Sequence, residues 1–188
     1  MATLPTEFPA TRQGARVTSC TGCSNENAEL KRCTRCLLAA YCNRECQRKD
    51  FRRHKTTCGE IVKFNAARDK IDPVYLRNPF FMGVSYCIGS LPETSHFNFL
   101  GQRLIVVVEI IGRVLYENSS TVKVRDVTNQ FTHIIFKFKD TDEMAGLEYK
   151  LRLGTYVAIL QAPLRISSYV NKTTDILIES LSQIYFIP

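Results

Sequence analysis

The sequence predicts two modules: a small cysteine-rich module near the N-terminus, followed by an all-β domain with five strands and one short helix. Seven of the eight cysteines in the 188-residue chain lie between Cys20 and Cys58. A segment of that length cannot build a sufficient apolar core, so its cysteines must supply the crosslinks. From Leu104 onward, β-branched and aromatic residues alternate with polar ones, which is typical of strands.

The ligand-type residues of the first module come in four closely spaced pairs. They are C-x2-C at Cys20 and Cys23, C-x2-C at Cys33 and Cys36, C-x3-C at Cys42 and Cys46, and H-x3-C at His54 and Cys58. A C-x2-C pair points two sulfurs from one turn at the same ion, and the wider pairs place two ligands on one face of a helical turn. Eight such ligands make two closed tetrahedral sites, so we expect two structural Zn²⁺ ions as cofactors.

Disulfide bonds are the alternative use of these cysteines, and they belong to oxidising compartments. Residues 1–19, which we expect to be a flexible tail, contain no apolar region of a secretory signal. No stretch approaches the roughly 18 apolar residues of a membrane span. We therefore expect an intracellular protein, in the nucleus or cytoplasm, with no membrane partner and with metal on its thiols.

This cysteine and histidine pattern closely resembles the MYND zinc finger over residues 20–58. Spacing alone leaves open which pairs share an ion. The resemblance implies that the two sites interleave: Cys20, Cys23, Cys42 and Cys46 hold the first zinc, and Cys33, Cys36, His54 and Cys58 hold the second. Seven thiolates and two Zn²⁺ together add a charge of about −3, which brings the formal net charge of +7 to about +4.

The resemblance also implies a protein-interaction module, because MYND fingers commonly bind short proline-containing peptides in a shallow groove. Gln47 matches a groove position that can hydrogen-bond an extended peptide, and Phe51 stands where the family usually has tryptophan. Phe51 offers an apolar platform without an indole N–H, or alternatively packs inside a small core. The basic residues nearby are either a solvated helical face or select an acidic or phosphate-bearing partner: Arg44, Arg48, Lys49, Arg52, Arg53 and Lys55.

Residues 59–102 read as a helix followed by an ordered connector. The helix is predicted by apolar residues at helical spacing (Ile61, Val62, Phe64, Ala67 and Ile71) and should stop before Pro73. The connector around Phe80 and Phe81 is too apolar for a free linker, so we expect it to pack on one domain or both. Cys87, isolated in this apolar context, is expected to be a small buried hydrophobe.

Residues 103–188 carry five expected strands, within residues 103–117, 120–128, 129–140, 155–166 and 175–188, with a short helix between the third and fourth. Asp140 or Thr141 would cap that helix and Gly154 would follow it. Gly112 inside the long first strand predicts a bulge or bend. This order is that of an OB-like barrel, with an SH3-like barrel as the structural alternative.

The segment also resembles OB domains of the replication protein A and telomere-end-protein type. The resemblance lies in Gly112-Arg113-Val114, in "DVTN" from Asp126, and in "GTYVAILQA" from Gly154. Asn129 replaces the usual turn glycine, which it can do because asparagine tolerates the left-handed conformation, and Ala162 replaces a second glycine.

OB domains commonly bind single strands on the outer face of strands two and three. Alternation places four basic residues there, beside His133 and Ile135: Lys123, Arg125, Lys137 and Lys139. The same alternation turns Phe136 and Phe138 inward, which leaves this face without a stacking aromatic unless Tyr116, Phe131 or Tyr169 supplies one from a loop. The face is therefore either a surface for single-stranded DNA or RNA or an ordinary polar strand face.

The sequence does not predict an enzyme or a small-molecule substrate. It has no P-loop, G-x-S-x-G or H-E-x-x-H motif, and no signature of the SET domain that some MYND proteins carry. His96 and His133 lack nearby cysteine or acidic clusters, and Asp140 and Asp142 fit a turn and cap.

We therefore expect an adaptor that tethers partners: the finger recruits a protein and the barrel gives a second binding surface. A single-stranded nucleic-acid-binding protein and a structural subunit of a larger complex are the alternatives.

Overall fold

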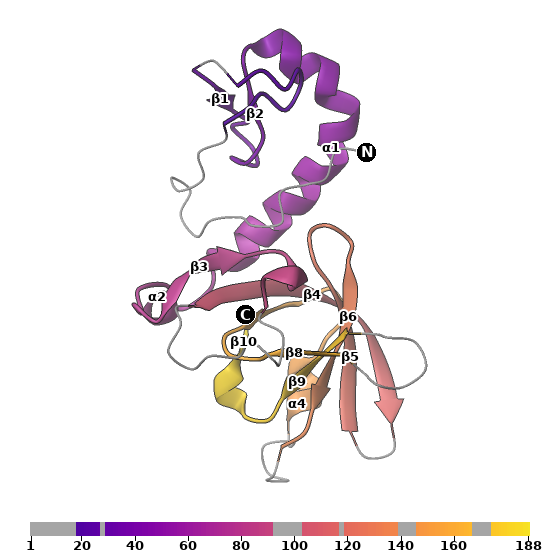
Figure 1. Ribbon diagram of the computed structural model, residues 1–188. Coiled ribbons are helices and arrows are strands. Elements are labelled where there is room, and N and C mark those ends of the chain that lie inside the picture. The colour runs from indigo at the N-terminus through magenta and orange to yellow at the C-terminus, as the bar shows by residue number, and fades with distance from the viewer. Residues whose placement is uncertain (1–17, 27–28, 92–102, 117–118, 139–145, 167–173) are drawn as a thin grey trace.

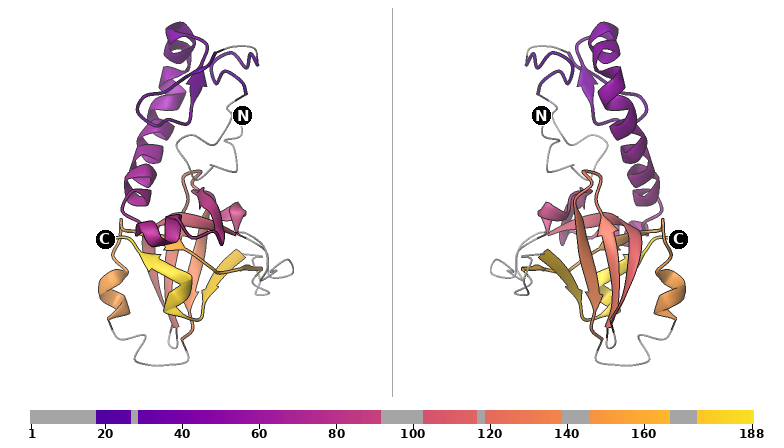
Figure 2. Two further views of the ribbon diagram at one scale, coloured as in Figure 1. Left: turned by 90° about the vertical axis from the view of Figure 1, so that its left-hand side faces the viewer. Right: turned by 90° about the vertical axis from the view of Figure 1, so that its right-hand side faces the viewer.

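The computed structural model describes residues 18–26, 29–91, 103–116, 119–138, 146–166 and 174–188. A small N-terminal module lies at one end of a long helix, α1 (Arg44–Arg68), and a mostly-β domain lies at the other end (Figure 1). The side views in Figure 2 show the same arrangement, with α1 rising from the β domain. Among the described residues, none of the helices combines the length and apolar character needed to cross a membrane.

The N-terminal module is built from a two-stranded hairpin and the first half of α1. Strands β1 (Lys31–Arg32) and β2 (Ala40–Tyr41) pair antiparallel. The helix begins after Asn43, whose side chain accepts a hydrogen bond from the backbone N–H of Cys46 and so caps the helix.

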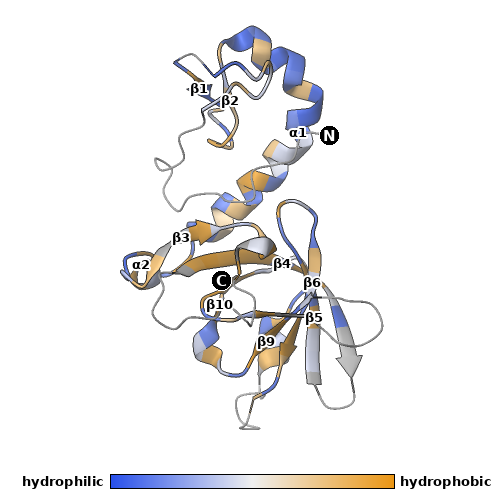
Figure 3. Cartoon of the chain, in the orientation of Figure 1, coloured by the Kyte–Doolittle hydropathy of each residue, from blue (hydrophilic) through white to orange (hydrophobic). Residues whose placement is uncertain are grey.

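Helix α1 belongs to both modules. Its buried residues before residue 59 are Asp50, His54 and Cys58, which face the N-terminal module, and those after it are Ile61, Phe64 and Ala67. The helix expected from Ile61 onward is thus the second half of a 25-residue helix that begins in the cysteine-rich segment and ends at Arg68. Figure 3 shows the corresponding change in hydropathy, from mostly hydrophilic near the hairpin to more hydrophobic near the β domain.

The connector adds further elements against the β domain. Pro73 occupies the first turn of α2 (Pro73–Leu76), and β3 (Phe81–Ser85) and the 3-10 helix η1 (Ile88–Ser90) follow. Strand β3 pairs in parallel with β4, so this part of the connector is an extra strand of the sheet. Cys87 is buried, as expected.

The β domain follows the expected order of strands. It contains β4 (Arg103–Tyr116), β5 (Ser119–Arg125), β6 (Phe131–Phe136), α4 (Leu147–Lys150), β7 (Tyr156–Ile159), β8 (Leu164–Ile166), β9 (Thr174–Ile178), η3 (Leu181–Gln183) and β10 (Ile184–Phe186). The sheet order is β10-β7-β4-β5-β6-β9-β8, with β6 and β9 parallel. Consecutive strands β7 and β8 pair with β4 and β9 respectively, so this segment connects the two sides of an OB-like half-barrel.

Two of the five expected strands are interrupted. The fourth divides into β7 and β8 at a segment that contains Pro163, which has no N–H to donate to a ladder. The fifth divides into β9 and β10 at η3, where Ser180 and Gln183 form a reciprocal capping box. Local side-chain hydrogen bonds thus divide the strand where sequence alternation alone predicted continuity.

Two turn predictions are confirmed. The β4–β5 register shifts between Ile110 and Gly112, which is the bulge expected at that glycine. Asn129 has a φ of 65°, the left-handed conformation that the turn after β5 requires. The buried carboxylate of Asp126 holds this turn, because it accepts hydrogen bonds from the backbone N–H groups of Thr128 and Gln130.

The short helix is displaced from its expected start. Helix α4 begins at Leu147 with Gly146 at its N-cap, and Leu151 rather than Gly154 follows it directly. The expected capping residues Asp140 and Thr141 lie outside the described residues, as do residues 1–17, His96, Lys139, Asp142 and Tyr169.

The buried apolar residues form two clusters. One fills the barrel and includes Val122, Val124, Ile134 and Phe136, which confirms the predicted inward face of these strands. The other runs from the cysteine-rich module along α1 to the outside of the β domain, and it includes Phe64, Tyr86, Val107, Ala158 and Ile187. The second half of α1 is therefore packed on the barrel through a continuous apolar contact.

Candidate metal centres and binding surfaces

The eight predicted ligands converge in two groups. Cys20, Cys23, Cys42 and Cys46 form one, and Cys33, Cys36, His54 and Cys58 form the other, with the ligand atoms of each group within 4.8 Å of one another. The structure contains no disulfide bond between the eight cysteines, all of which it describes, and seven of them lie in these two groups. The interleaved pairing that the resemblance to the MYND finger implied is therefore the arrangement in the structure.

The spacing of the ligand atoms fits zinc. Two sulfurs at about 2.3 Å from a tetrahedral ion lie about 3.8 Å apart. The Sγ atoms of Cys23 and Cys42 are 3.7 Å apart, and those of Cys33 and Cys58 are 4.0 Å apart. His54 Nε2 lies 3.7 Å from Cys36 Sγ, which identifies Nε2 as its ligand atom. Four cysteines in the first site, and three cysteines with one histidine in the second, are the donor sets of structural zinc ions.

The local backbone favours the thiolate form of one cysteine in each site, Cys20 and Cys33. Burial by itself would raise the pKa of Cys20, but hydrogen bonds from the backbone N–H groups of Cys42, Gly22 and Cys23 lower it to about 6. Burial likewise opposes ionisation of Cys33, whose pKa falls to about 6 because of the backbone N–H of Cys36 and the side chain of His54. A lowered pKa increases the population of the thiolate, which is the form that binds zinc. Each site therefore contains at least one cysteine that is readily deprotonated.

A buried polar network supports the second site. The carboxylate of Asp50 accepts hydrogen bonds from Tyr41 Oη at 2.9 Å and from Arg53 Nε at 2.7 Å. Arg53 also donates to the carbonyl of Thr21, which ties α1 to the turn of the first site. The Tyr41 ring contacts the His54 ring edge-on at 5.8 Å between centroids and so restricts the orientation of that ligand.

A second set of hydrogen bonds joins the finger to the barrel. Asn65 of α1 donates through Nδ2 to the carbonyl of the zinc ligand Cys36 at 3.2 Å. Its Oδ1 accepts a 2.8 Å hydrogen bond from the hydroxyl of Tyr86, whose own carbonyl accepts from the N–H of Val127. One side chain therefore contacts both the second metal centre and the β domain.

The two predicted peptide-contacting residues lie one turn apart on α1. Phe51 is 56% exposed, so it does not belong to the small core, and Gln47 is half-buried beside it. The neighbouring basic residues Arg44, Arg48, Arg52 and Lys55 are exposed as well. The arrangement gives α1 an outward face with one aromatic ring, one amide and several positive charges.

The predicted nucleic-acid face of the barrel is partly engaged within the protein. Arg125 contacts Glu109 at 2.7 Å and Glu60 of α1 at 2.9 Å, and it donates to the side chain of Asn129 at 2.9 Å. Burial would lower the pKa of the Arg125 guanidinium, but the hydrogen bond to Glu109 and both carboxylate charges raise it. The positive charge of Arg125 is thus paired with carboxylates at the contact between α1 and the barrel.

The rest of that face contains an aromatic residue that the sequence reasoning left unplaced. Phe131 is 58% exposed, and the Lys123 ammonium lies 4.7 Å from its ring centroid. His133 lies 3.4 Å from the Asp175 carboxylate, Lys137 is exposed, and Lys139 falls outside the described residues. Side chains of a strand alternate between its two faces, so the alternation that turns Phe136 inward turns Phe131, five residues earlier, outward. This alternation is the feature of the sequence from which the side of Phe131 could have been predicted.

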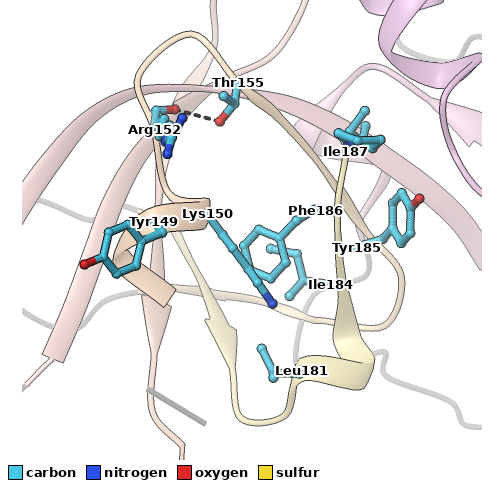
Figure 4. A pocket seen from close by; sticks show the side chains of 10 residues that line it. Tyr149, Lys150, Arg152, Thr155, Leu181, Ile184, Tyr185, Phe186 and Ile187 are labelled. Carbon is cyan, nitrogen blue, oxygen red and sulfur yellow. Dashed lines mark hydrogen bonds between the residues drawn. The ribbon is translucent and has the colours of Figure 1, made fainter. Parts of the chain in front are cut away.

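A shallow groove of about 590 Å³ lies beside strand β10 (Figure 4). Tyr149 and Lys150 of α4 stand on one side, and Phe186 and Leu181 lie across from them. The Lys150 ammonium is 5.4 Å from the Phe186 ring centroid. Because β10 ends the order of the sheet, the groove borders an edge strand.

Sequence comparison finds relatives that match about a quarter of this chain. "SET domain-containing protein 14" of Caenorhabditis elegans is 45% identical over 53 residues, which cover 28% of this chain and 12% of the relative. N-lysine methyltransferase SMYD2 of Homo sapiens is 42% identical over 45 residues, which cover 24% of this chain and 10% of the relative. The chain thus spans only about a tenth of these relatives, and the activity in the name of SMYD2 belongs to that protein.

Structural comparison gives distant similarities. The crystal structure of Schizosaccharomyces pombe Pot1pC bound to ssDNA has a TM-score of 0.36 and 14% identity, over 51% of this chain and 85% of that one. The S. pombe Stn1–Ten1 complex has a TM-score of 0.35 and 16% identity, over 57% of this chain and 76% of that one. Similarities this low carry no functional conclusion.

The family comparison agrees with the metal centres. The model of the MYND finger matches residues 20–58, the segment that contains all eight ligands and no other cysteine. Residues 20–58 are therefore a MYND zinc finger with two zinc sites.

Proposed function

We propose that this protein is a zinc-dependent interaction adaptor whose finger binds a short apolar or proline-containing segment of a protein partner on the outward face of α1. The observation that supports this most directly is the 56% exposure of Phe51. An exposed aromatic ring on a rigid helix is a low-entropy platform for an apolar side chain.

Gln47 adds the second element that such a surface needs. Its amide carries both a donor and an acceptor, which are the groups that an extended peptide backbone presents. Gln47 and Phe51 are four residues apart on one helix, so their relative position is fixed by α1.

Binding of labelled proline-containing peptides to the zinc-loaded full chain tests this proposal. Fluorescence anisotropy should show micromolar binding that Phe51→Ala reduces by at least tenfold and Gln47→Ala by a smaller factor. Leu153→Ala, which removes another exposed apolar side chain between α4 and β7 of the β domain, is the matched control. Equal affinities for the wild type and Phe51→Ala would contradict the proposal.

Single-stranded nucleic-acid binding by the barrel is the second candidate function, and one observation favours it. Phe131 is an exposed ring next to Lys123, and base stacking on one ring is worth roughly 1–3 kcal/mol. Lys137 extends the positive charge, whereas Arg125 is engaged by two carboxylates.

Titration of a labelled single-stranded oligonucleotide at low and moderate salt separates the two candidates. If the barrel reads nucleic acid, Phe131→Ala and the Lys123→Glu/Lys137→Glu double variant should abolish binding at moderate salt, whereas Phe51→Ala should not change it. Binding that appears only at low salt and ignores Phe131 would remove this candidate, because generic charge binds phosphate in that way.

A further inference from the structure

The charged residues on the first half of α1 divide into two classes. Lys49 pairs with Glu45 at 3.7 Å and Arg53 pairs with Asp50 at 2.7 Å. Four others are exposed, and in the part of the chain that the structure describes they have no ion-pair or hydrogen-bond partner: Arg44, Arg48, Arg52 and Lys55. We call these four the basic stripe.

The basic stripe surrounds the exposed ring of the finger. Arg44, Arg48, Phe51 and Lys55 follow the spacing i, i+4, i+7 and i+11, which places them along one face of a helix. Arg52 lies at the border of that face. The second half of α1, by contrast, pairs Lys63 with Glu60 and Arg68 with Asp69. Uncompensated positive charge is therefore concentrated at Phe51 and nowhere else along the described helix.

We infer that the finger binds acidic peptides: an apolar or proline residue contacts Phe51, and aspartate or glutamate residues on both sides of it contact the basic stripe. This inference rests on the proposed function of the finger and adds the chemistry of the partner. Charge complementarity of this kind selects partners and accelerates association.

The geometry also gives the spacing of the acidic residues. Arg44 lies seven residues before Phe51 and Lys55 four residues after it, or about 10 Å and about 6 Å along the axis at 1.5 Å per residue. An extended peptide advances about 3.3 Å per residue. Acidic residues about three positions to one side of the central residue and about two positions to the other side would therefore meet the stripe.

A peptide fits this surface better than the phosphate backbone of a nucleic acid does. A phosphate offers only acceptors, which the arginines alone would satisfy, and it leaves the acceptor of the Gln47 amide unused. Gln47 is half-buried on the border of the same face, where a peptide N–H can reach it.

The test uses three labelled peptides with the same central proline pair and different residues at the flanking positions: glutamate, glutamine or lysine. With the zinc-loaded full chain at moderate salt, the glutamate peptide should bind about tenfold more tightly than the glutamine peptide, and the lysine peptide should bind least tightly. The advantage of glutamate should decrease as salt increases.

Charge-reversal variants locate the effect. Arg48→Glu/Lys55→Glu should remove the preference for the glutamate peptide and leave affinity for the glutamine peptide nearly unchanged, whereas Arg48→Lys should retain the preference. Arg77→Glu/Arg152→Glu, the same charge change at two exposed positions outside the stripe, is the control. Zinc content and circular dichroism must match the wild type in each variant.

The outcomes distinguish the inference from the proposed function. Equal affinity for the glutamate and glutamine peptides, with both lost in Phe51→Ala, would overturn the inference and retain the function. Affinity unaffected by Phe51→Ala would overturn both. A phosphoserine peptide that binds when the glutamate peptide does not, or an oligonucleotide that competes regardless of Phe51, would also overturn the acidic-peptide assignment.

Discussion

Arg125 of β5 and Glu60 of α1 form an ion pair at 2.9 Å across 65 residues of sequence, and it joins the zinc finger to the barrel. Both side chains are about three-quarters buried, and Glu109 gives Arg125 a second carboxylate at 2.7 Å. Lys63 and Arg125 hold the pKa of Glu60 below its ordinary value, so Glu60 is charged at neutral pH. The pair lies beside the apolar contact of α1, where solvent screening is reduced.

Replacing Arg125 should cost more stability than replacing Glu60. Arg125→Met leaves Glu109 without its cation and Glu60 with only the more exposed Lys63, and it should lower the free energy of unfolding by about 2–3 kcal/mol. Glu60→Gln retains the Arg125–Glu109 pair and should cost about 1 kcal/mol. Urea unfolding with zinc present measures both, with Lys63→Ala as a surface-pair control of a few tenths of a kcal/mol. A larger loss of stability in Glu60→Gln than in Arg125→Met would mean that the Arg125–Glu60 ion pair does not stabilise the contact between α1 and the barrel.

Removal of zinc should unfold the finger and leave the barrel folded. The barrel has its own apolar cluster, whereas the finger depends on eight metal ligands. Chelation should release two zinc ions per chain and reduce the helical circular dichroism signal, while strand amide protons of β5 and β6 remain protected. His54→Ala should reduce the zinc content to about one per chain. A complete loss of β structure on chelation would show that the barrel cannot fold alone.

Two glycines should respond in opposite directions to alanine. A Cβ at Gly22 would lie 2.6 Å from the carbonyl oxygen of Cys46, so Gly22→Ala must displace the backbone of the first zinc site. We expect zinc affinity at that site to fall tenfold or more, as measured by chelator competition. Gly59→Ala meets no atom within 4 Å inside α1 and should raise stability by about 0.5–1 kcal/mol. Unchanged zinc affinity in Gly22→Ala would show that the turn relaxes freely.

Cys87 should report opening of the junction. Burial and the charge of Asp126 raise its pKa to about 12, so at neutral pH its thiolate is much rarer than that of an ordinary thiol. In zinc-loaded protein, alkylation of Cys87 followed by peptide mass mapping should be very slow. Arg125→Met should accelerate it about thirtyfold, because loss of the ion pair favours the open state. Labelling at the rate of a free thiol would contradict the buried placement.

Sequence reasoning was most successful where local chemistry decides structure. The zinc ligands, the bulge at Gly112 and the left-handed Asn129 all depend on residues close in sequence or on a motif with fixed spacing. Hydrophobic alternation likewise predicted the inward face of β5 and β6.

The junction could not be predicted in the same way. Glu60 and Arg125 are ordinary polar residues until the fold brings them together, and nothing near either one indicates its partner. Strand β3 depends on parallel pairing with β4, which no local turn signal specifies. The alternation of side chains along β6 indicates on which face of the strand Phe131 lies. Its solvent exposure, however, depends on whether another part of the chain packs over that face.

The continuity of α1 has a consequence for partners that engage both modules. A helix of 25 residues is about 37 Å long, and its second half is fixed to the barrel by packing, by Asn65 and by Glu60. A ligand bound at Phe51, as we propose, would therefore be held at a set distance and direction from the barrel, unlike a ligand on a flexible tether. On the proposed function the protein would act as a molecular ruler: among bivalent partners it would favour those whose two contact points match this span, whatever the affinity of each contact alone.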